Sequence, residues 1–326
     1  MIPESESIRI SGNLRLCTNY YLLAKVSHFS TIDPTQVTVP ELHGTLLGAI
    51  GPRPIALAST IDPDGRPNLS PFSFFNVFSA NPPIAIFSPA RRGRDNTTKH
   101  TYENVKQVPE TVINVVNYAL VQQTSLYSTE YPEGVNEFDK AGLTAIPSEK
   151  VKPFRVKESP VQLECKVKEV VELGSEGGAG NLVICEVVLI HVANDILNEN
   201  GKIDQHKIDL VGRLGGNWYC RASGSALFEV EKPLTTLGIG IDAIPETIRH
   251  SHILTGNHLG QLGNVEQLPA TELIQQCRQQ EEVASLFDQH GGDEASLTTA
   301  LHTLAAHKLA HNQVAEAWCI LLTQNN

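Results

Sequence analysis

The sequence predicts a mainly β protein, an antiparallel barrel or sandwich, followed by a smaller helical region. Between residues 41 and 230, short apolar runs are joined by turn residues, with few long helical patterns between them. Residues 161–167 alternate apolar and polar side chains with a period of two, as a half-buried strand does. After Pro233 the composition changes, and residues 270–326 carry apolar residues at helical spacing.

The composition is that of a globular protein, and its charge limits the classes of partner. Of 326 residues, 41% are hydrophobic, and 36 acidic residues exceed 25 basic ones. The net charge of −11 argues against nucleic acid or an anionic membrane surface as a partner. No apolar run approaches the ~18 residues of a membrane span, and the N-terminus lacks a secretory pattern. Six cysteines without CxxC spacing favour reduced, mostly buried thiols. We therefore expect a cytoplasmic protein.

The predicted strands follow one another along the first part of the chain. Residues 54–60 lead into the turn Asp62–Gly65, in which Pro63 fixes φ and Gly65 accepts a positive φ. Further apolar runs occupy 71–78, 82–88 and 111–117.

The strand pair that follows has a clear pattern. Residues 161–167 predict one buried face, with Gln162 and Glu164 on a solvent-exposed face. The glycine-rich stretch 174–180 predicts a flexible turn, and residues 182–192 predict an interior strand. For the C-terminal region we expect two or three helices.

A basic island lies at residues 91–99, where Arg91, Arg92, Arg94 and Lys99 are close together in an acidic chain. Residues 95–98 are good N-cap residues, so Lys99, His100 and Thr101 are expected at or near a helix start. Free N–H groups there, with the helix dipole, would form an anion site. A solvated charged loop before an ordinary capped helix is the alternative.

No catalytic triad, P-loop or dinucleotide glycine motif is evident, and we assign no catalytic residue. His307 and His311 are four residues apart on a predicted helix, without a matching carboxylate or cysteine, so we expect a solvated face and no metal site. His191 is expected to be a core or rim residue. Arg213 and Tyr219 could reach a cofactor or a dimer seam, but packing is the simpler interpretation.

Six short motifs, in order, resemble those of the flavin reductase-like family, whose flavoredoxin-like members bind flavin mononucleotide (FMN) in a split β-barrel. In this family, Asp stands in place of Asn81 and of His100. The motifs are Arg53-Pro54-Ile55-Ala56, Asp62 to Gly65, Ser73-Phe74-Phe75-Asn76, Asn81-Pro82-Pro83, Lys99-His100-Thr101 and Val112-Ile113-Asn114.

The resemblance implies an antiparallel Greek-key split β-barrel that binds FMN at 41–230. It would lie between an N-terminal extension (1–40) and a mostly helical C-terminal extension (231–326). It implies that the phosphate lies near the start of the helix and that residues 73–76 follow the isoalloxazine edge. The implied FMN-binding residues are Arg53, Ser59, Thr60, Ser73, Phe74, Phe75, Asn76, Ser88, Arg91, Lys99, His100 and Thr101.

The implied activity is that of an FMN-binding oxidoreductase, an NAD(P)H-dependent reductase of flavin or a small molecule. NADH or NADPH would be the electron donor, and the family implies a homodimer with flavin at or near the subunit boundary. Two alternatives remain open. One is an FMN-binding electron carrier or store without turnover, and the other is a barrel that has lost its flavin and serves as an interaction module.

Overall fold

The computed structural model describes residues 29–126, 131 and 134–324, and the chain divides into two compact units, Met1–Phe228 and Glu229–Asn326. Most of the expected N-terminal extension, residues 1–28, lies outside the described residues. The two units are described separately below.

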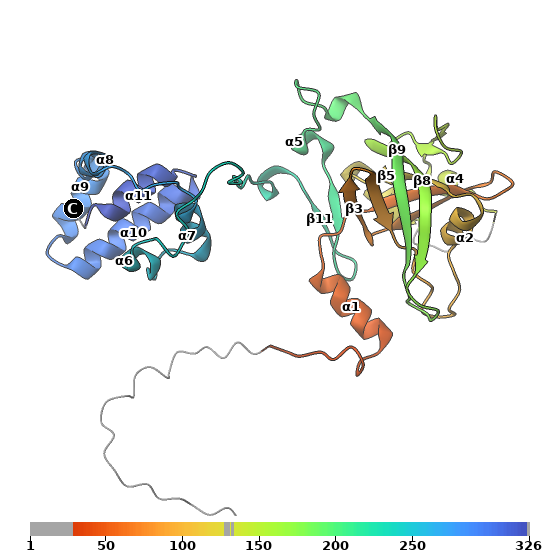
Figure 1. Ribbon diagram of the computed structural model, residues 1–326, viewed down its shortest axis with the longest axis horizontal. Helices are drawn as coiled ribbons and strands as arrows, with labels where there is room; N and C mark the ends of the chain where they lie inside the picture. Colours follow the sequence, from red (N-terminus) through yellow and green to blue (C-terminus); the bar gives the residue numbers. More distant parts are fainter. Residues whose placement is uncertain (1–28, 127–130, 132–133, 325–326) are drawn as a thin grey trace, which may run out of the picture. The chain divides into compact units, whose positions relative to one another are not determined.

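The first unit is built on a seven-stranded antiparallel sheet, in the order β2-β1-β5-β8-β9-β4-β3. Strands β3, β5, β8 and β9 of this sheet are labelled in Figure 1. The predicted antiparallel β architecture is confirmed at this level. Edge strands β2 and β3 are consecutive in the chain, and the sheet does not close into a continuous ladder between them. The strands are β1 (Ala56–Ile61), β2 (Pro67–Phe72), β3 (Phe75–Ala80), β4 (Pro83–Phe87), β5 (Glu110–Val115), β8 (Val161–Glu172) and β9 (Asn181–Val192).

Short helices and hairpins surround this sheet. Hairpin β6–β7 lies between α4 and β8, and hairpin β10–β11 follows β9 and α5. These elements are α1 (Val39–Ala49), α2 (His100–Gln107), η1 (Tyr118–Leu120), α3 (Val121–Leu126), α4 (Glu137–Ala141), β6 (Ala145–Ile146), β7 (Arg155–Val156), η2 (Asn194–Ile196), α5 (Gln205–Ile208), β10 (Val211–Arg213), β11 (Tyr219–Arg221) and η3 (Gly224–Ala226).

Local sequence explains the first hairpin of the sheet. The Asp62 carboxylate accepts hydrogen bonds from the N–H groups of Asp64 and Arg66, and Gly65 has a φ of +84°. This turn joins β1 to β2 as predicted. Strand β1 is buried along its whole length, because apolar clusters cover both faces of the sheet.

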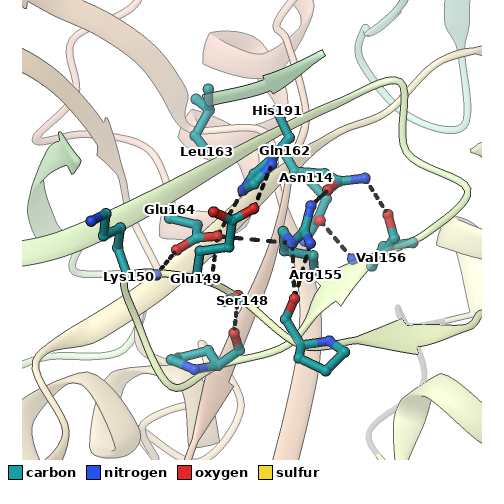
Figure 2. A network of polar contacts seen from close by, with 12 residues as sticks. Asn114, Ser148, Glu149, Lys150, Arg155, Val156, Gln162, Leu163, Glu164 and His191 are labelled. Atoms are coloured by element: carbon teal, nitrogen blue, oxygen red, sulfur yellow. Dashed lines mark hydrogen bonds and ion pairs between the residues drawn. The ribbon is translucent and has the colours of Figure 1, made fainter. Parts of the chain in front are cut away.

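The outer face of β8 differs from the prediction. Gln162 and Glu164 are buried, and Glu164 is 0% exposed. Residues 144–157, which we call the strap, contain β6 and β7 and cover this part of β8 (Figure 2). Strand periodicity correctly gave the alternation, but the strap, which precedes β8 in the chain, buries the second face at Gln162 and Glu164.

The second unit contains six helices within its described residues, so the expectation of two or three is wrong. Most of them are short: α6 (Glu246–Arg249), α7 (Gly256–Gly263), α8 (Thr271–Arg278), α9 (Glu281–His290), α10 (Glu294–Ala310) and α11 (Val314–Leu322). Their buried apolar side chains form a core of their own, including Trp318, whose indole N–H donates to the Leu262 carbonyl. Across the described chain, no helix is both long and apolar enough to cross a membrane.

The described cysteines are free thiols, and Cys17 lies outside the described residues. Burial raises the pKa of Cys165 to about 12, so this thiol remains protonated and unreactive at neutral pH.

Candidate functional site

The start of α2 leaves backbone donors unused. Helix α2 begins at His100, and Lys99 is its N-cap without a side-chain capping bond. The Lys99 carbonyl accepts hydrogen bonds from Tyr102 and Glu103, whereas the N–H groups of His100 and Thr101 make none to the described residues. The predicted helix start is confirmed, and its free N–H groups favour an anion.

Lys99 adds a partly buried positive charge at this position. Its Nζ lies 6.0 Å from the centroid of the Phe72 ring, and within the described chain it pairs with no carboxylate. Burial, and then the nearby charge of Arg92, lower the pKa of Lys99. Because a partly desolvated cation without a counter-ion is unfavourable, a bound anion here would be stabilised.

Arg91 and Arg92 hold the loop that precedes α2. The Arg91 guanidinium donates to the Asn96 side chain and to its carbonyl, both at 2.7 Å. Arg92 donates to the Thr97 hydroxyl at 3.0 Å and to the Thr98 carbonyl. These contacts keep the basic island compact despite the repulsion between its positive charges.

The turn at residues 174–180 is docked against the basic island. The Ala179 carbonyl accepts from the Arg91 N–H at 2.8 Å, and the Arg91 carbonyl accepts from the Gly178 N–H at 3.0 Å. A Cβ at Gly177 would lie 3.0 Å from the Arg92 carbonyl oxygen, so a larger residue would require the two backbone segments to move slightly apart. The flexible turn expected from sequence is therefore held in place by backbone contacts.

Ser88 is buried beside the same turn. Its hydroxyl accepts the Asn181 N–H at 3.1 Å, and a Cβ at Gly180 would lie 2.9 Å from the Ser88 oxygen. The hydroxyl accepts this bond and keeps its own proton, so the predicted phosphate contact of Ser88 stays a prediction.

Thr60 and Thr101 meet in a buried cluster that the sequence did not predict. The Asn68 amide donates to the Thr60 hydroxyl at 3.1 Å and to the Thr101 hydroxyl at 2.9 Å. The Asn104 amide also donates to Thr60, at 3.1 Å. All four side chains are buried, and together they fix α2 against β1 and β2. The one local signal was an asparagine within a strand, where this residue is uncommon.

Ser59 does not join this cluster. Successive strand residues point to opposite faces of a sheet, so Ser59 and Thr60 cannot line one groove. The Ser59 hydroxyl is buried and has no hydrogen-bond partner among the described residues.

Residues 73–76 divide between core and surface. Phe75 packs into the cluster that contains Phe72 and Phe87, whereas Phe74 is 41% exposed. The Phe74 carbonyl accepts the Ser88 N–H at 2.9 Å, which joins this segment to the end of β4. Asn76 is exposed, and its side-chain oxygen accepts the N–H of Val77.

Arg53 is buried and fully engaged within the protein. Its guanidinium donates to the carbonyls of residues 47, 50 and 214 and, at 3.4 Å, to the Ser73 hydroxyl. Arg53 therefore supports the segment that begins at Ser73, and its contacts are with residues other than those around Lys99.

His100 lines a cavity of about 400 Å³, which Asn68 and Asn104 of the buried cluster also line. Four carboxylate side chains line that cavity, and burial raises the pKa of one of them, Glu137, although backbone hydrogen bonds oppose the shift. A cavity rich in carboxylates disfavours phosphate, so only the backbone N–H of His100 is assigned to the candidate anion site. The four acidic residues are Asp62, Asp64, Glu103 and Glu137.

Comparison with known proteins places the first unit in a family. Residues 49–207 match the model of the flavin reductase like domain. An uncharacterized protein of Aquifex aeolicus is 40% identical over 189 residues, which cover 58% of this chain and 94% of that protein.

Solved structures give the same result for the fold. Nitrilotriacetate monooxygenase component B from Bacillus cereus is 29% identical, with a TM-score of 0.58, and the match covers 62% of this chain and 99% of that one. A split barrel domain protein from Shewanella frigidimarina is 28% identical, with a TM-score of 0.54, and the match covers 63% of this chain and 98% of that one. The chain belongs to the flavin reductase-like family of flavin-binding proteins.

Proposed function

We propose that the first unit is a split β-barrel that binds FMN and reduces flavin or a small molecule with NADH or NADPH. We also propose residues 41–230 as the flavin domain, between the extensions 1–40 and 231–326. The cytoplasmic location expected from the sequence stays a prediction.

One observation carries the proposal: a partly buried lysine without a carboxylate partner lies at a helix start with free N–H groups. Lys99 supplies the charge, and the His100 and Thr101 amides supply aligned donors. The buried Thr60–Asn68–Asn104 contacts hold this helix start, so the donors are preorganised. These features support the phosphate of FMN as the ligand.

The ring of the flavin would follow residues 73–76. Ser73 is fixed by Arg53, and Phe74 is partly exposed beside it, so this segment offers a supported edge with free surface. When bound, the flavin supplies hydride chemistry, and the protein positions it and leaves one face open. Such a role requires no nucleophile or metal from the chain.

The phosphate assignment is tested by comparing FMN with riboflavin, which lacks the phosphate. Loss of a charged hydrogen bond costs about 1.5–3 kcal/mol, so Lys99→Gln should weaken FMN binding about tenfold to hundredfold. Riboflavin binding should change little. Lys106→Gln is the control, because Lys106 lies on the same helix but pairs with Glu172 at 3.0 Å. Equal FMN affinity in Lys99→Gln and the wild type would refute the assignment.

The activity is tested by adding NADH or NADPH anaerobically to the FMN-loaded protein. Bleaching of the flavin absorbance by either nucleotide supports the reductase. Absence of bleaching with both would favour the electron carrier.

We further propose a homodimer. Edge strand β3 exposes Phe78, which is 64% accessible, and hairpin β10–β11 exposes Trp218, which is 75% accessible. Exposed apolar side chains on an open sheet edge favour association with another chain. Light scattering should give twice the chain mass of 35.6 kDa, and a monomer at micromolar concentration would contradict the proposal.

A further inference from the structure

A second, smaller cavity lies between the end of β2, α3 and hairpin β10–β11. Its volume is about 100 Å³, which corresponds to about three water molecules at roughly 30 Å³ each. This is room for a carboxylate group or a similar small ion. It is lined by Ile55, Pro71, Ser73, Thr124, Arg213 and Tyr219.

The charge at this cavity is positive and unbalanced. Arg213 lines it directly, and Arg53 lies behind it, bonded to the lining residue Ser73. Burial, and then the charge of Arg213, lower the pKa of Arg53, as expected for neighbouring cations. Within the described residues, neither guanidinium pairs with a carboxylate, and no acidic side chain lines the cavity.

Arg213 is held in position but keeps unused donors. Its Nη1 donates to the Trp218 carbonyl at 3.1 Å, and its guanidinium carbon lies 4.5 Å from the centroid of the Tyr219 ring. Its backbone is fixed by two hydrogen bonds with Arg53, at 3.0 and 2.8 Å. Its Nε and Nη2 have no partner among the described residues.

Thr124 provides an independent indication of a ligand. This side chain is 3% exposed and lines the cavity, yet its hydroxyl has no hydrogen-bond partner among the described residues. A buried polar group without a partner is unfavourable, which a ligand at this position would correct. The Ser73 hydroxyl accepts from Arg53, so its own proton remains available. The free groups that line this cavity are thus mainly donors.

We propose that this cavity binds the carboxylate of a small organic acid, with Arg213 as its charged partner and Thr124 and Ser73 as hydroxyl donors. A planar guanidinium matches the paired oxygens of a carboxylate or a phosphate, whereas a spherical ion cannot use both N–H groups in this way. The apolar part of the lining, which includes Ile55 and Pro71, favours an organic acid over an inorganic anion. Ser73 also begins the segment assigned above to the flavin ring. We assign the acid as the small molecule that accepts electrons from the flavin, and this role rests on the proposed function. The existence of the anion site does not depend on that function.

The test compares acetate with acetamide, its neutral isostere, on the full-length protein at constant ionic strength. Affinity is measured from the concentration dependence of the thermal midpoint, with Trp218 fluorescence as a second readout. Acetate should stabilise the protein, and acetamide should not. Arg213→Gln should weaken acetate binding about tenfold or more, and Thr124→Val about threefold.

Matched controls separate binding from folding. Thr124→Ser keeps the hydroxyl, and Arg221→Gln removes an arginine of the same hairpin that pairs with Asp209. Both should bind acetate within about twofold of the wild type. Equal responses to acetate and acetamide, or unchanged affinity in a folded Arg213→Gln variant, would overturn the proposal. Chloride or phosphate binding as tightly as acetate would also overturn it, because the site would then select inorganic anions.

FMN titration of the same proteins distinguishes this inference from the proposed function. Acetate binding by a protein that does not bind FMN would support the anion site while the flavin proposal fails. FMN binding and bleaching without any response to acetate would overturn this inference alone.

Discussion

Lys99 links the local structure to a pH dependence. Burial and the charge of Arg92 lower the pKa of Lys99 below its ordinary value of 10.5. The ammonium form, which binds an anion, is therefore lost at a lower pH than for an exposed lysine, although a bound phosphate opposes this loss.

We expect the affinity for FMN, relative to riboflavin, to fall as the pH is raised toward 10.5. Because FMN and riboflavin have the same isoalloxazine ring, ionisation of the ring affects both affinities equally and does not change their ratio. Lys99→Arg should keep the ratio constant over the same range, because arginine remains charged. A ratio that does not change with pH in the wild type would show that Lys99 does not contact the phosphate.

At the residue scale, the sequence predicted the start of α2 but not the buried hydrogen bonds that hold this helix against the sheet. The position of Lys99 at the helix start is a local signal, and the structure confirms it. None of the cap residues 95–98 is the N-cap, because Lys99 takes that position without a side-chain capping bond. The contacts of Asn68 with Thr101 and of Asn104 with Thr60 join residues 33 and 44 positions apart. No local pattern reports such pairings. For the same reason, nothing in the sequence indicates that Arg91 binds Asn96 or that Ser88 binds the Asn181 backbone. The phosphate contacts predicted for these two residues stay predictions.

Among the elements, the strap depends on one buried carboxylate. Glu164 accepts the N–H groups of Glu149 and Lys150 from the strap, at 2.9 and 2.5 Å (Figure 2). It also bonds His191 at 2.7 Å, and Arg155 lies 3.8 Å away. Burial alone raises the pKa of Glu164, but the hydrogen bonds lower it more, so the net pKa lies below the ordinary value.

We expect Glu164→Gln to reduce the free energy of unfolding by about 3 kcal/mol at pH 7, because a buried charge pair loses one partner. The folded pKa is depressed, so this stabilisation is present above pH 4.5 and is lost as the pH falls through the folded value. Urea unfolding at pH 7 and in acid should show the two proteins converging at low pH. Glu186→Gln, which breaks a more exposed pair with Lys168, should cost less than about 1 kcal/mol. A constant difference across this pH range would contradict the assigned role.

Element prediction succeeded where the signal was local. Period-two alternation and the Asp62–Gly65 turn gave β8 and the β1–β2 hairpin correctly. The outer face of β8 was assigned wrongly, because the strap that covers Gln162 and Glu164 leaves no trace in the strand's own pattern. The helices after residue 233 were undercounted for a related reason. A break such as Gln279–Gln280, between α8 and α9, contains no glycine or proline.

Over the whole molecule, each unit has its own apolar core, and the second unit lies beyond the segment matched by the family model. We therefore expect the units to unfold separately. The chain has two tryptophans, the exposed Trp218 in the first unit and the buried Trp318 in the second. The fluorescence of each tryptophan therefore reports on the unfolding of one unit.

Trp318→Ala should destabilise the second unit by about 3–5 kcal/mol and leave FMN affinity unchanged. Calorimetry should show one transition moving to lower temperature while the FMN-sensitive transition stays in place. Trp218→Phe is the matched control, because its side chain is exposed and outside that core. A single transition that shifts as a whole in Trp318→Ala would show that the units are coupled.

The docked 174–180 turn has a practical consequence for engineering. Epitope tags and fluorescent reporters are commonly inserted into glycine-rich connections, which are assumed to tolerate them. Here an insertion would disrupt the backbone hydrogen bonds that join Arg91 to Gly178 and Ala179, and with them the loop that precedes α2. The turn at Gly201, with a φ of +70° and open space around its Cβ position, is a safer place for a label.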